Sequence, residues 1–414
     1  MQSHHKRVIE NIFSLSLING INMIMPLVTL PYLIKVIGIE KYGAYSIVFS
    51  LIQYVILFSA YGFSFSTTKQ ISQYRENKEF VNEVFNSTLI CRFIIAFVTT
   101  VPVFLLCAFF YPEEYSLMFL LGVGMILGDI VNPVWLYQGM EKMRFMTFVN
   151  LISKTIFTIL IFVGIRQESD YIYVTFLNSC GYLVSGIVSL IFAIKFFNIK
   201  LSLPKKNHIK KQFIDGWYIF LSTLSMNLYR NSNVLILSFF LGEGLVGIYS
   251  GAEKVIKAVQ AVTNPISNAL FPHVAKSFKH SSLQSKLHMI FKLCKYMSIL
   301  LIVISGGAYI GAPILTKILL DNVDNAIGLI HIMCPVIFFG GINYIMGIVG
   351  LVNLNAQRSF FIYVMISGII SIIMLIIATP IIGLQAAAYS MSLTEILLFC
   401  MCSYKLYIIH KCKH

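Results

Sequence analysis

The segment Gly38-Ile39-Glu40-Lys41-Tyr42-Gly43-Ala44-Tyr45-Ser46 decides the fold, because the chain contains its pattern twice. The second copy is Gly242-Glu243-Gly244-Leu245-Val246-Gly247-Ile248-Tyr249-Ser250, and both copies read Gly-x4-Gly-x-Tyr-Ser. Each copy lies between two long apolar stretches. Glycine adopts positive φ at little cost, so each pattern predicts a tight turn between two helices. Two equivalent turns indicate a duplicated helical bundle, in which Gly38, Gly43 and Tyr45 match Gly242, Gly247 and Tyr249.

The composition is that of a membrane protein. The chain of 414 residues is 57% hydrophobic and 12% charged, and its mean hydropathy is +0.81. Apolar stretches of about twenty residues recur along it, and each can cross a bilayer core of about 30 Å as a helix. We expect an all-α polytopic protein with twelve membrane helices. Two six-helix lobes, residues 1–197 and 215–414, are predicted to flank a basic cytoplasmic linker at residues 198–214.

Lysine and arginine are concentrated on one side of the predicted membrane. Alternate connections, with both termini included, hold 20 of these residues, whereas the intervening turns hold 4. Because short cytoplasmic loops are enriched in them, both termini are predicted to be cytoplasmic and the glycine turns to lie outside the cytoplasm. The same distribution accounts for the net charge of +14 without a nucleic-acid partner.

Several kinds of catalytic or metal site find no support in the sequence. The eight cysteines form no CxxC pair, so neither a disulfide framework nor a zinc site is indicated. The chain has no GxxxxGK[ST] phosphate loop, and no HExxH or Ser-His-Asp arrangement stands out. No loop is long enough to hold an enzymatic domain. We therefore expect a protein that is not an enzyme and that uses no metal or cofactor.

Charged residues inside the predicted membrane helices mark the candidate site, because a charge at mid-bilayer costs about 2.5–3.5 kcal/mol. Arg230, Lys254 and Lys257 lie in the two helices that the second glycine turn joins, and we predict that they form a cationic patch. Glu253 precedes Lys257 by four residues and is expected to neutralise it. Three cations with one nearby acid indicate an anionic cargo, most simply one that bears phosphate.

Further charges fall in other predicted helices. Asp129 and Lys154 lie at similar predicted depths, where they form either a structural pair or part of the functional site. Arg92 either joins Lys154 in binding the cargo or extends its side chain to the membrane interface. Glu395 lies near the middle of the last helix. If protons drive the transport, Asp129, Glu253 and Glu395 are the titratable candidates.

Two pairs of glycines have the spacing of closely packed helix faces. They are Gly124 with Gly128 and Gly307 with Gly311. Each pair predicts a face on which a neighbouring helix packs closely.

The sequence resembles a known family. The run Asn132-Pro133-Val134-Trp135-Leu136-Tyr137-Gln138-Gly139-Met140-Glu141-Lys142-Met143 is similar to the Pro-x-Trp-aromatic-aromatic-Gln-Gly-x-Glu-Lys signature of Wzx-type polysaccharide flippases. These flippases share the MOP superfamily with MATE multidrug exporters and lipid II flippases. The segment Pro26-Leu27-Val28-Thr29-Leu30-Pro31-Tyr32-Leu33, the second glycine turn and Phe271-Pro272 also resemble the family.

The resemblance implies a MATE-like fold, in which two six-helix lobes surround a cavity that opens alternately to each side. It implies a cargo of undecaprenyl-diphosphate-linked oligosaccharide, an O-antigen repeat unit, moved from the cytoplasmic to the periplasmic leaflet of the bacterial inner membrane. Partners are then this lipid-linked oligosaccharide, the bilayer and other membrane proteins of polysaccharide assembly. Between Glu10 and Lys35 the first predicted helix has no charged residue, unlike lipid II flippases and exporters with an acid there, which favours the O-antigen type.

Two alternative functions remain open at this point. A multidrug exporter of the same fold would need an acidic or apolar cavity for cationic drugs, which the surplus of cations disfavours. A polysaccharide polymerase would need a substantial extracytoplasmic loop, whereas the predicted turns are short. We therefore expect a flippase that works by alternating access.

Overall fold

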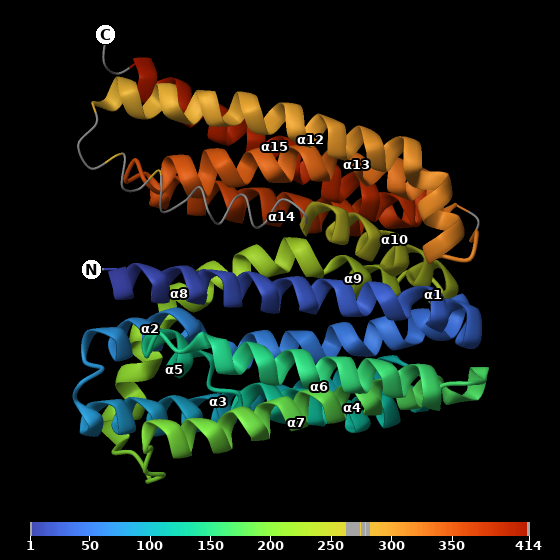
Figure 1. Ribbon diagram of the computed structural model, residues 1–414. Helices are drawn as coiled ribbons and strands as arrows, with labels where there is room; N and C mark the ends of the chain where they lie inside the picture. Colours follow the sequence, from blue (N-terminus) through green and yellow to red (C-terminus); the bar gives the residue numbers. More distant parts are fainter. Residues whose placement is uncertain (1, 262–273, 275–277, 279–281, 324, 412–414) are drawn as a thin grey trace. The chain divides into compact units, whose positions relative to one another are not determined.

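The computed structural model describes residues 2–261, 274, 278, 282–323 and 325–411 (Figure 1). All regular secondary structure in these ranges is helical, which confirms the predicted all-α class. The first helices are α1 (Gln2–Ala60), α2 (Phe63–Gln73), α3 (Lys78–Phe110), α4 (Glu113–Val131), α5 (Val134–Gly139), α6 (Met143–Gly164), η1 (Glu168–Asp170) and α7 (Tyr171–Phe197). The later helices are α8 (Lys206–Asn231), α9 (Asn233–Ser238), α10 (Glu243–Ala261), α12 (Leu283–Leu319), α13 (Ala326–Asn343), η2 (Tyr344–Leu351), α14 (Gln357–Ile382) and α15 (Gln385–Lys411).

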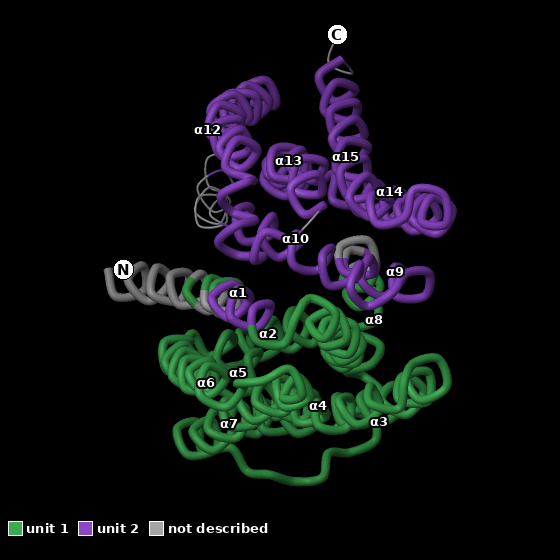
Figure 2. The backbone as a smooth tube through the Cα atoms, turned by 90° about the vertical axis from the view of Figure 1, so that its right-hand side faces the viewer, with its two compact units in different colours: residues 1–25, 36–224 green, residues 26–35, 225–414 purple. Residues whose placement is uncertain are grey.

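The chain divides into two compact units, which Figure 2 shows in different colours. Unit 1 comprises residues 1–25 and 36–224, and unit 2 comprises residues 26–35 and 225–414. One stretch of α1 therefore belongs to the unit that is otherwise built from the second half of the chain. Apolar stretches indicate where helices lie but not which helices they pack against. The sequence therefore did not indicate that residues 26–35 belong to unit 2. The predicted lobe limits stay a prediction.

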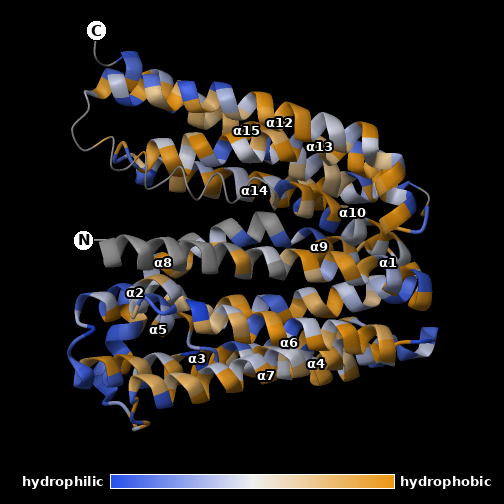
Figure 3. Ribbon diagram, in the orientation of Figure 1, coloured by the Kyte–Doolittle hydropathy of each residue, from blue (hydrophilic) through white to orange (hydrophobic). Residues whose placement is uncertain are grey.

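Hydrophobic residues line most of the long helices (Figure 3). Within the described ranges, nine segments are long and apolar enough to cross a membrane. The first, Met23–Gln73, has 51 residues and extends across the first glycine turn at Gly38. At about 1.5 Å per residue it is far longer than one bilayer core of about 30 Å. The helices predicted on either side of the second glycine turn are not among the nine, so the count of twelve stays a prediction.

The first glycine pattern forms a sharp break inside α1. Gly38 has φ 75° and ψ 165°, the one non-helical pair of angles recorded within this helix, and the chain reverses direction there (Figure 1). Gly43 continues the helix. In the second pattern, Gly242 directly precedes α10 and Gly247 lies inside it, and neither has positive φ. The turn at Gly38 therefore uses the positive φ that glycine tolerates, whereas the turn at Gly242 does not.

The same order of helix contacts recurs in both units. In unit 1, α4 packs against α3 and α7, and α7 packs against α6. In unit 2, α13 packs against α12 and α15, and α15 packs against α14. This matching order supports the predicted internal repeat.

Close packing through glycine occurs in unit 1. A Cβ atom on Gly128 would overlap the backbone of Tyr182 in α7, and one on Gly186 would overlap the carbonyl oxygen of Gly128. The predicted close-packing face of α4 is therefore confirmed. For Gly307 and Gly311 the described part of the chain does not bear out the matching prediction, because a Cβ at either position would meet none of its atoms within 4 Å.

Candidate functional site

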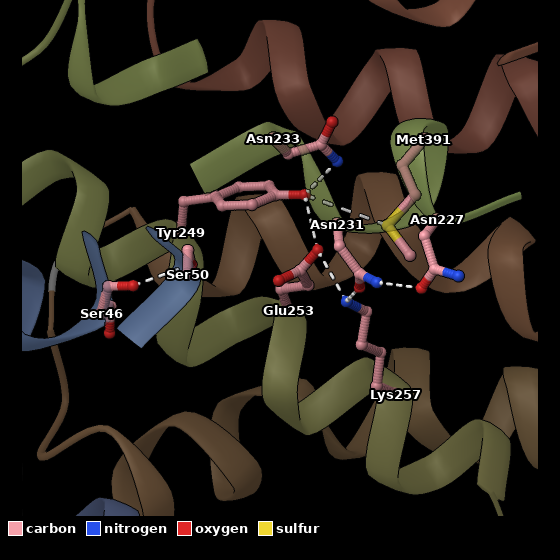
Figure 4. A network of polar contacts seen from close by, with 9 residues as sticks. All are labelled: Ser46, Ser50, Asn227, Asn231, Asn233, Tyr249, Glu253, Lys257 and Met391. Carbon is pink, nitrogen blue, oxygen red and sulfur yellow. Dashed lines mark hydrogen bonds and ion pairs between the residues drawn. The ribbon is translucent and has the colours of Figure 1, made fainter. Parts of the chain in front are cut away.

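A ladder of polar side chains follows one face of α10 in unit 2 (Figure 4). Tyr249, Glu253 and Lys257 are spaced four residues apart, so their side chains lie one above the other on the helix. The Tyr249 hydroxyl donates to Glu253 Oε1 at 3.3 Å, and Lys257 Nζ lies 3.1 Å from the same oxygen. The expected neutralisation of Lys257 by Glu253 is thus confirmed.

Asparagine side chains extend this ladder at both ends (Figure 4). Asn233 in α9 donates its amide to the Tyr249 hydroxyl at 2.6 Å. Lys257 donates to Asn231 Oδ1 at 3.2 Å, and the amide of Asn231 donates to Asn227 at 2.9 Å. The Glu253 side chain is 8% exposed and that of Lys257 is 29% exposed. A carboxylate this deeply buried requires such partners, because an unpaired buried charge is costly.

The structure describes part of the predicted cationic patch. Lys254 and Lys257 lie on the same helix, and both are partly buried. Arg230 belongs to α8, but its side chain lies outside the described residues. Its chain neighbour Asn231 does contact Lys257, which brings this end of α8 to the patch.

Arg92 and Asp129 form an ion pair inside unit 1. Arg92 is 4% exposed, so it does not extend to the membrane interface as one prediction held. The ion pair recorded for Asp129 joins it to Arg92, whereas the sequence reasoning expected Lys154 as its partner. Lys154 Nζ lies 5.2 Å from the ring centroid of Tyr182, within the range of a cation–π contact.

Arg92 also completes the end of α4. Its Nη1 donates to the carbonyl oxygens of Asp129 at 2.8 Å and Ile130 at 3.3 Å. The helix would normally supply Asp129 with the N–H of Pro133, which proline lacks. The N–H of Asn132 donates to the same carbonyl at 3.3 Å, and the guanidinium adds the shorter bond, so it takes over part of the role of the missing Pro133 donor. Arg92 therefore supports the fold directly.

The Pro-x-Trp motif is a packing element as well. The guanidinium of Arg92 lies 5.3 Å from the Trp135 ring, and the Tyr137 hydroxyl donates to the carbonyl of Ser189 at 2.6 Å. A Cβ on Gly139 would lie 2.7 Å from Ile71, so only glycine lets α5 approach α2 this closely. These contacts explain the motif through the packing of α5 onto its neighbours.

Glu395 lies buried in α15 and is 3% exposed. The amide of Asn343 in α13 donates to Glu395 Oε2 at 2.7 Å and to its backbone carbonyl at 2.8 Å. Gly340 faces this pair, because a Cβ there would lie 3.6 Å from the Glu395 carboxyl carbon. Unit 2 thus holds a second buried carboxylate with an amide partner.

The repeat tyrosines have matching environments. Tyr45 is 6% exposed and its hydroxyl accepts from the amide of Asn178 at 3.3 Å, as Tyr249 accepts from Asn233. The asparagines come from different helices, so no sequence pattern would have found them. The i, i+4 spacing of Tyr249, Glu253 and Lys257 was visible in the sequence. Among the described residues, no group of three or more His, Cys, Asp or Glu side chains is placed to hold a metal ion.

Comparison with known proteins identifies relatives across most of the chain. Residues 8–278 match the family model described as polysaccharide biosynthesis protein. A protein from Escherichia coli (strain K12) named "Putative O-antigen transporter" is 27% identical over 400 residues, which cover 94% of each chain. A Shigella dysenteriae protein of the same name is 28% identical over 321 residues, covering 76% of this chain and 78% of the relative. These names agree with the expectation of a transport protein that is not an enzyme.

Solved structures show the same fold at low sequence identity. The lipid II flippase MurJ, in an inward closed conformation, has a TM-score of 0.77 and 14% identity, over 97% of this chain and 87% of that chain. An inward-facing MATE family multidrug resistance transporter of the MOP superfamily has a TM-score of 0.72 and 14% identity, over 96% of this chain and 99% of that chain. The MATE-like fold predicted from the sequence is thereby confirmed. Since the family model spans well over half of its residues, the chain belongs to the family of polysaccharide biosynthesis proteins.

Proposed function

We propose that this protein is a flippase for undecaprenyl-diphosphate-linked oligosaccharide, an O-antigen repeat unit. It moves this lipid from the cytoplasmic to the periplasmic leaflet of the bacterial inner membrane by alternating access, with both termini in the cytoplasm. The names of two relatives as O-antigen transporters support a polysaccharide-related cargo. The diphosphate of the cargo is inferred from the lysines of α10.

The observation that carries the proposal is the pair of partly buried lysines on α10. Lys254 and Lys257 share this helix with two acids. Glu253 is next to Lys254, and Glu243 is at the start of the helix. The two ammonium groups are carried three residues apart on one helix, so they lie on neighbouring faces of it. A diphosphate supplies the complementary charge and strong hydrogen-bond acceptors for lysine. We include Arg230 in this site. Lys154 in unit 1 is proposed separately as a residue that contacts the cargo.

The membrane potential favours this direction of transport. Moving an anion outward across an inside-negative potential gains about 2.3 kcal/mol per charge per 100 mV. A coupled ion is therefore not required by the charge of the cargo. If protons are coupled, the buried Glu395 is the better candidate, because Asp129 is paired with Arg92 and Glu253 with Lys257, whereas Glu395 accepts from the neutral amide of Asn343.

Leaflet-resolved detection of the lipid-linked oligosaccharide tests the proposal. In cells lacking the protein, the lipid-linked repeat unit should accumulate in the cytoplasmic leaflet, and the wild-type gene should restore its appearance in the outer leaflet. Arg230→Gln and Lys254→Gln should each fail to restore it while the protein remains in the membrane. Lys292→Gln, which changes an exposed lysine of α12, serves as the matched control and should restore transport.

Two results would contradict the proposal. An unchanged leaflet distribution on deletion would exclude the flippase activity itself. Normal transport by both the Arg230 and the Lys254 variants would leave the flippase activity in place but show that the patch is not its binding site. A drug-susceptibility panel on the same deletion strain separates a flippase from a multidrug exporter.

A further inference from the structure

Unit 2 contains a pocket whose lining residues do not include Tyr249, Glu253 or Lys257. Its volume is about 520 Å³, within the range of about 300–1,000 Å³ that is usual for small-molecule sites. Three connections between helices form it: the start of α10, the α12–α13 turn and the α14–α15 turn. The lining residues are Leu245, Asn322, Val323, Asn325, Ile327, Gly328, Leu329, Ile382, Leu384 and Gln385.

The described lining residues are uncharged and of two kinds. Asn322, Asn325 and Gln385 contribute exposed carboxamides, and the other side chains are aliphatic. Each carboxamide offers two N–H donors and one carbonyl acceptor. No side-chain hydrogen bond is recorded for these three amides within the described part of the chain. Their donors and acceptors are therefore available to a ligand that enters the pocket.

The backbone holds two of these amides in a defined place. Asn322 has φ 60° and Asn325 has φ 66°, a left-handed conformation that asparagine tolerates better than most residues. The N–H of Asn322 donates to the carbonyl of Thr316, which ties the turn to the end of α12. The amides are thus presented on a fixed turn beside the apolar wall.

We infer that this pocket binds one or a few sugar residues. A sugar hydroxyl is both a donor and an acceptor, which matches a carboxamide, and the C–H face of a pyranose ring matches aliphatic side chains. The described lining residues carry no formal charge, so they offer no cation to a diphosphate, and the pocket complements the lysine site. This inference goes beyond the proposed function and rests on it solely for the identity of the sugar, the oligosaccharide of the cargo.

The position of the pocket assigns it a role in release. The distribution of lysine and arginine predicts that all three of these connections face away from the cytoplasm. A sugar-binding pocket there engages the oligosaccharide after the lipid has crossed the membrane. The ligand is either the sugar part of the lipid-linked unit or a saccharide already freed from its lipid.

Gly328 allows the pocket to be filled without disturbing the fold. It lines the pocket in the first turn of α13, and a Cβ there would meet no atom within 4 Å. Gly328→Phe should therefore fold normally and weaken binding roughly tenfold or more, equivalent to about 1.4 kcal/mol. Gly307→Phe is the matched control, because Gly307 is an exposed helical glycine with equal space and lies outside the pocket.

A second pair of variants removes the amides while keeping the backbone. Glycine readily adopts the positive φ of Asn322 and Asn325, so the double variant Asn322→Gly with Asn325→Gly retains the turn. It should weaken binding by several-fold. Asn355→Gly is the control, since Asn355 is an exposed asparagine with φ 61° in another loop of unit 2.

Binding is measured on the full chain in lipid nanodiscs by isothermal titration. The first probe is the repeat-unit oligosaccharide released by mild acid from the host's own lipid-linked intermediates. The second probe is the intact lipid-linked repeat unit, which distinguishes a lipid-attached from a free sugar. Weaker binding of either probe by Gly328→Phe and by the double Asn variant, with both controls at wild-type affinity, supports the pocket.

Two outcomes overturn the inference: absence of binding to wild type with both probes, or wild-type affinity in the Gly328→Phe variant. Its failure is distinguishable from failure of the proposed function. If the wild-type protein binds the sugar but does not move the lipid between leaflets, the pocket inference stands and the proposed flippase function fails. If the wild-type protein flips the lipid and the Gly328→Phe variant binds the sugar with normal affinity, the proposed function stands and the pocket inference fails.

Discussion

Arg92 donates a hydrogen bond from Nη1 to the carbonyl oxygen of Asp129 at 2.8 Å and forms an ion pair with its carboxylate. One side chain thereby satisfies both the acid and the helix end that Pro133 leaves without a regular donor. Arg92, whose charge alone suggested a role in binding the cargo, therefore has a structural role. The following experiments separate such tasks from binding.

Arg92→Met should lower the free energy of unfolding by about 3 kcal/mol, because removing one partner leaves a charge without its counter-ion. Asp129→Asn in the same chain should recover part of this loss. Thermal unfolding in detergent measures both, and Arg144→Gln, an exposed arginine, should change little. If Arg92→Met melted like wild type yet lost affinity for the cargo, Arg92 would belong to the binding site.

The Glu253–Lys257 pair allows structure and function to be separated. Lys257→Met alone should destabilise the protein by about 1.5–3 kcal/mol, because it removes a charged hydrogen-bond partner of a carboxylate that is 8% exposed. Adding Glu253→Gln should restore much of the stability. We expect the stable double variant to remain inactive in flipping, since the lysine is absent. Restored flipping would show that Lys257 serves only to balance Glu253.

The two repeat tyrosines should differ in their contribution to stability. Tyr249→Phe removes a hydroxyl that bonds both Asn233 and Glu253, and it should cost about 1–3 kcal/mol. Tyr45→Phe loses a longer bond to Asn178, at 3.3 Å, and should cost about 0.5–1.5 kcal/mol. Chemical or thermal unfolding of the two variants side by side gives the comparison. Equal losses would argue against a special role for the Glu253 contact.

Glycine substitutions should have opposite effects in the two predicted packing pairs. Gly128→Ala places a methyl group into the backbone of Tyr182, and overpacking of this kind costs about 1–3 kcal/mol. Gly307→Ala meets open space and should stabilise its helix by about 0.5–1 kcal/mol. Melting temperatures of the purified variants test this. A loss of stability in Gly307→Ala would mean that this face has a packing partner after all.

Glu395→Gln tests proton coupling at the second buried acid. Glutamine retains an oxygen that accepts from Asn343, so the fold should be preserved. In proteoliposomes, we expect an imposed proton gradient to accelerate flipping by wild type but not by Glu395→Gln. Glu79→Gln, at an exposed position near the start of α3, should respond like wild type. A variant that still responds to the gradient would exclude Glu395 as the coupling acid.

The sequence by itself determined the class of the protein, because membrane insertion depends on local properties. Apolar stretches longer than the bilayer core require helices, whose backbone groups are satisfied internally. The glycine turn at Gly38 and the i, i+4 pairing of Glu253 with Lys257 were likewise local, and both were predicted correctly. The Trp-containing motif predicted the family, although its residues prove to act through packing.

Tertiary structure alone decided which residues meet across helices. Hydropathy places Arg92, Asp129 and Lys154 within helices but does not fix the rotation of each helix about its axis. That rotation, set by side-chain packing and by glycines such as Gly128, selected Arg92 as the recorded ion-pair partner of Asp129. For the same reason, no sequence pattern indicated that Asn343 would contact Glu395, or that three separate turns would form one pocket.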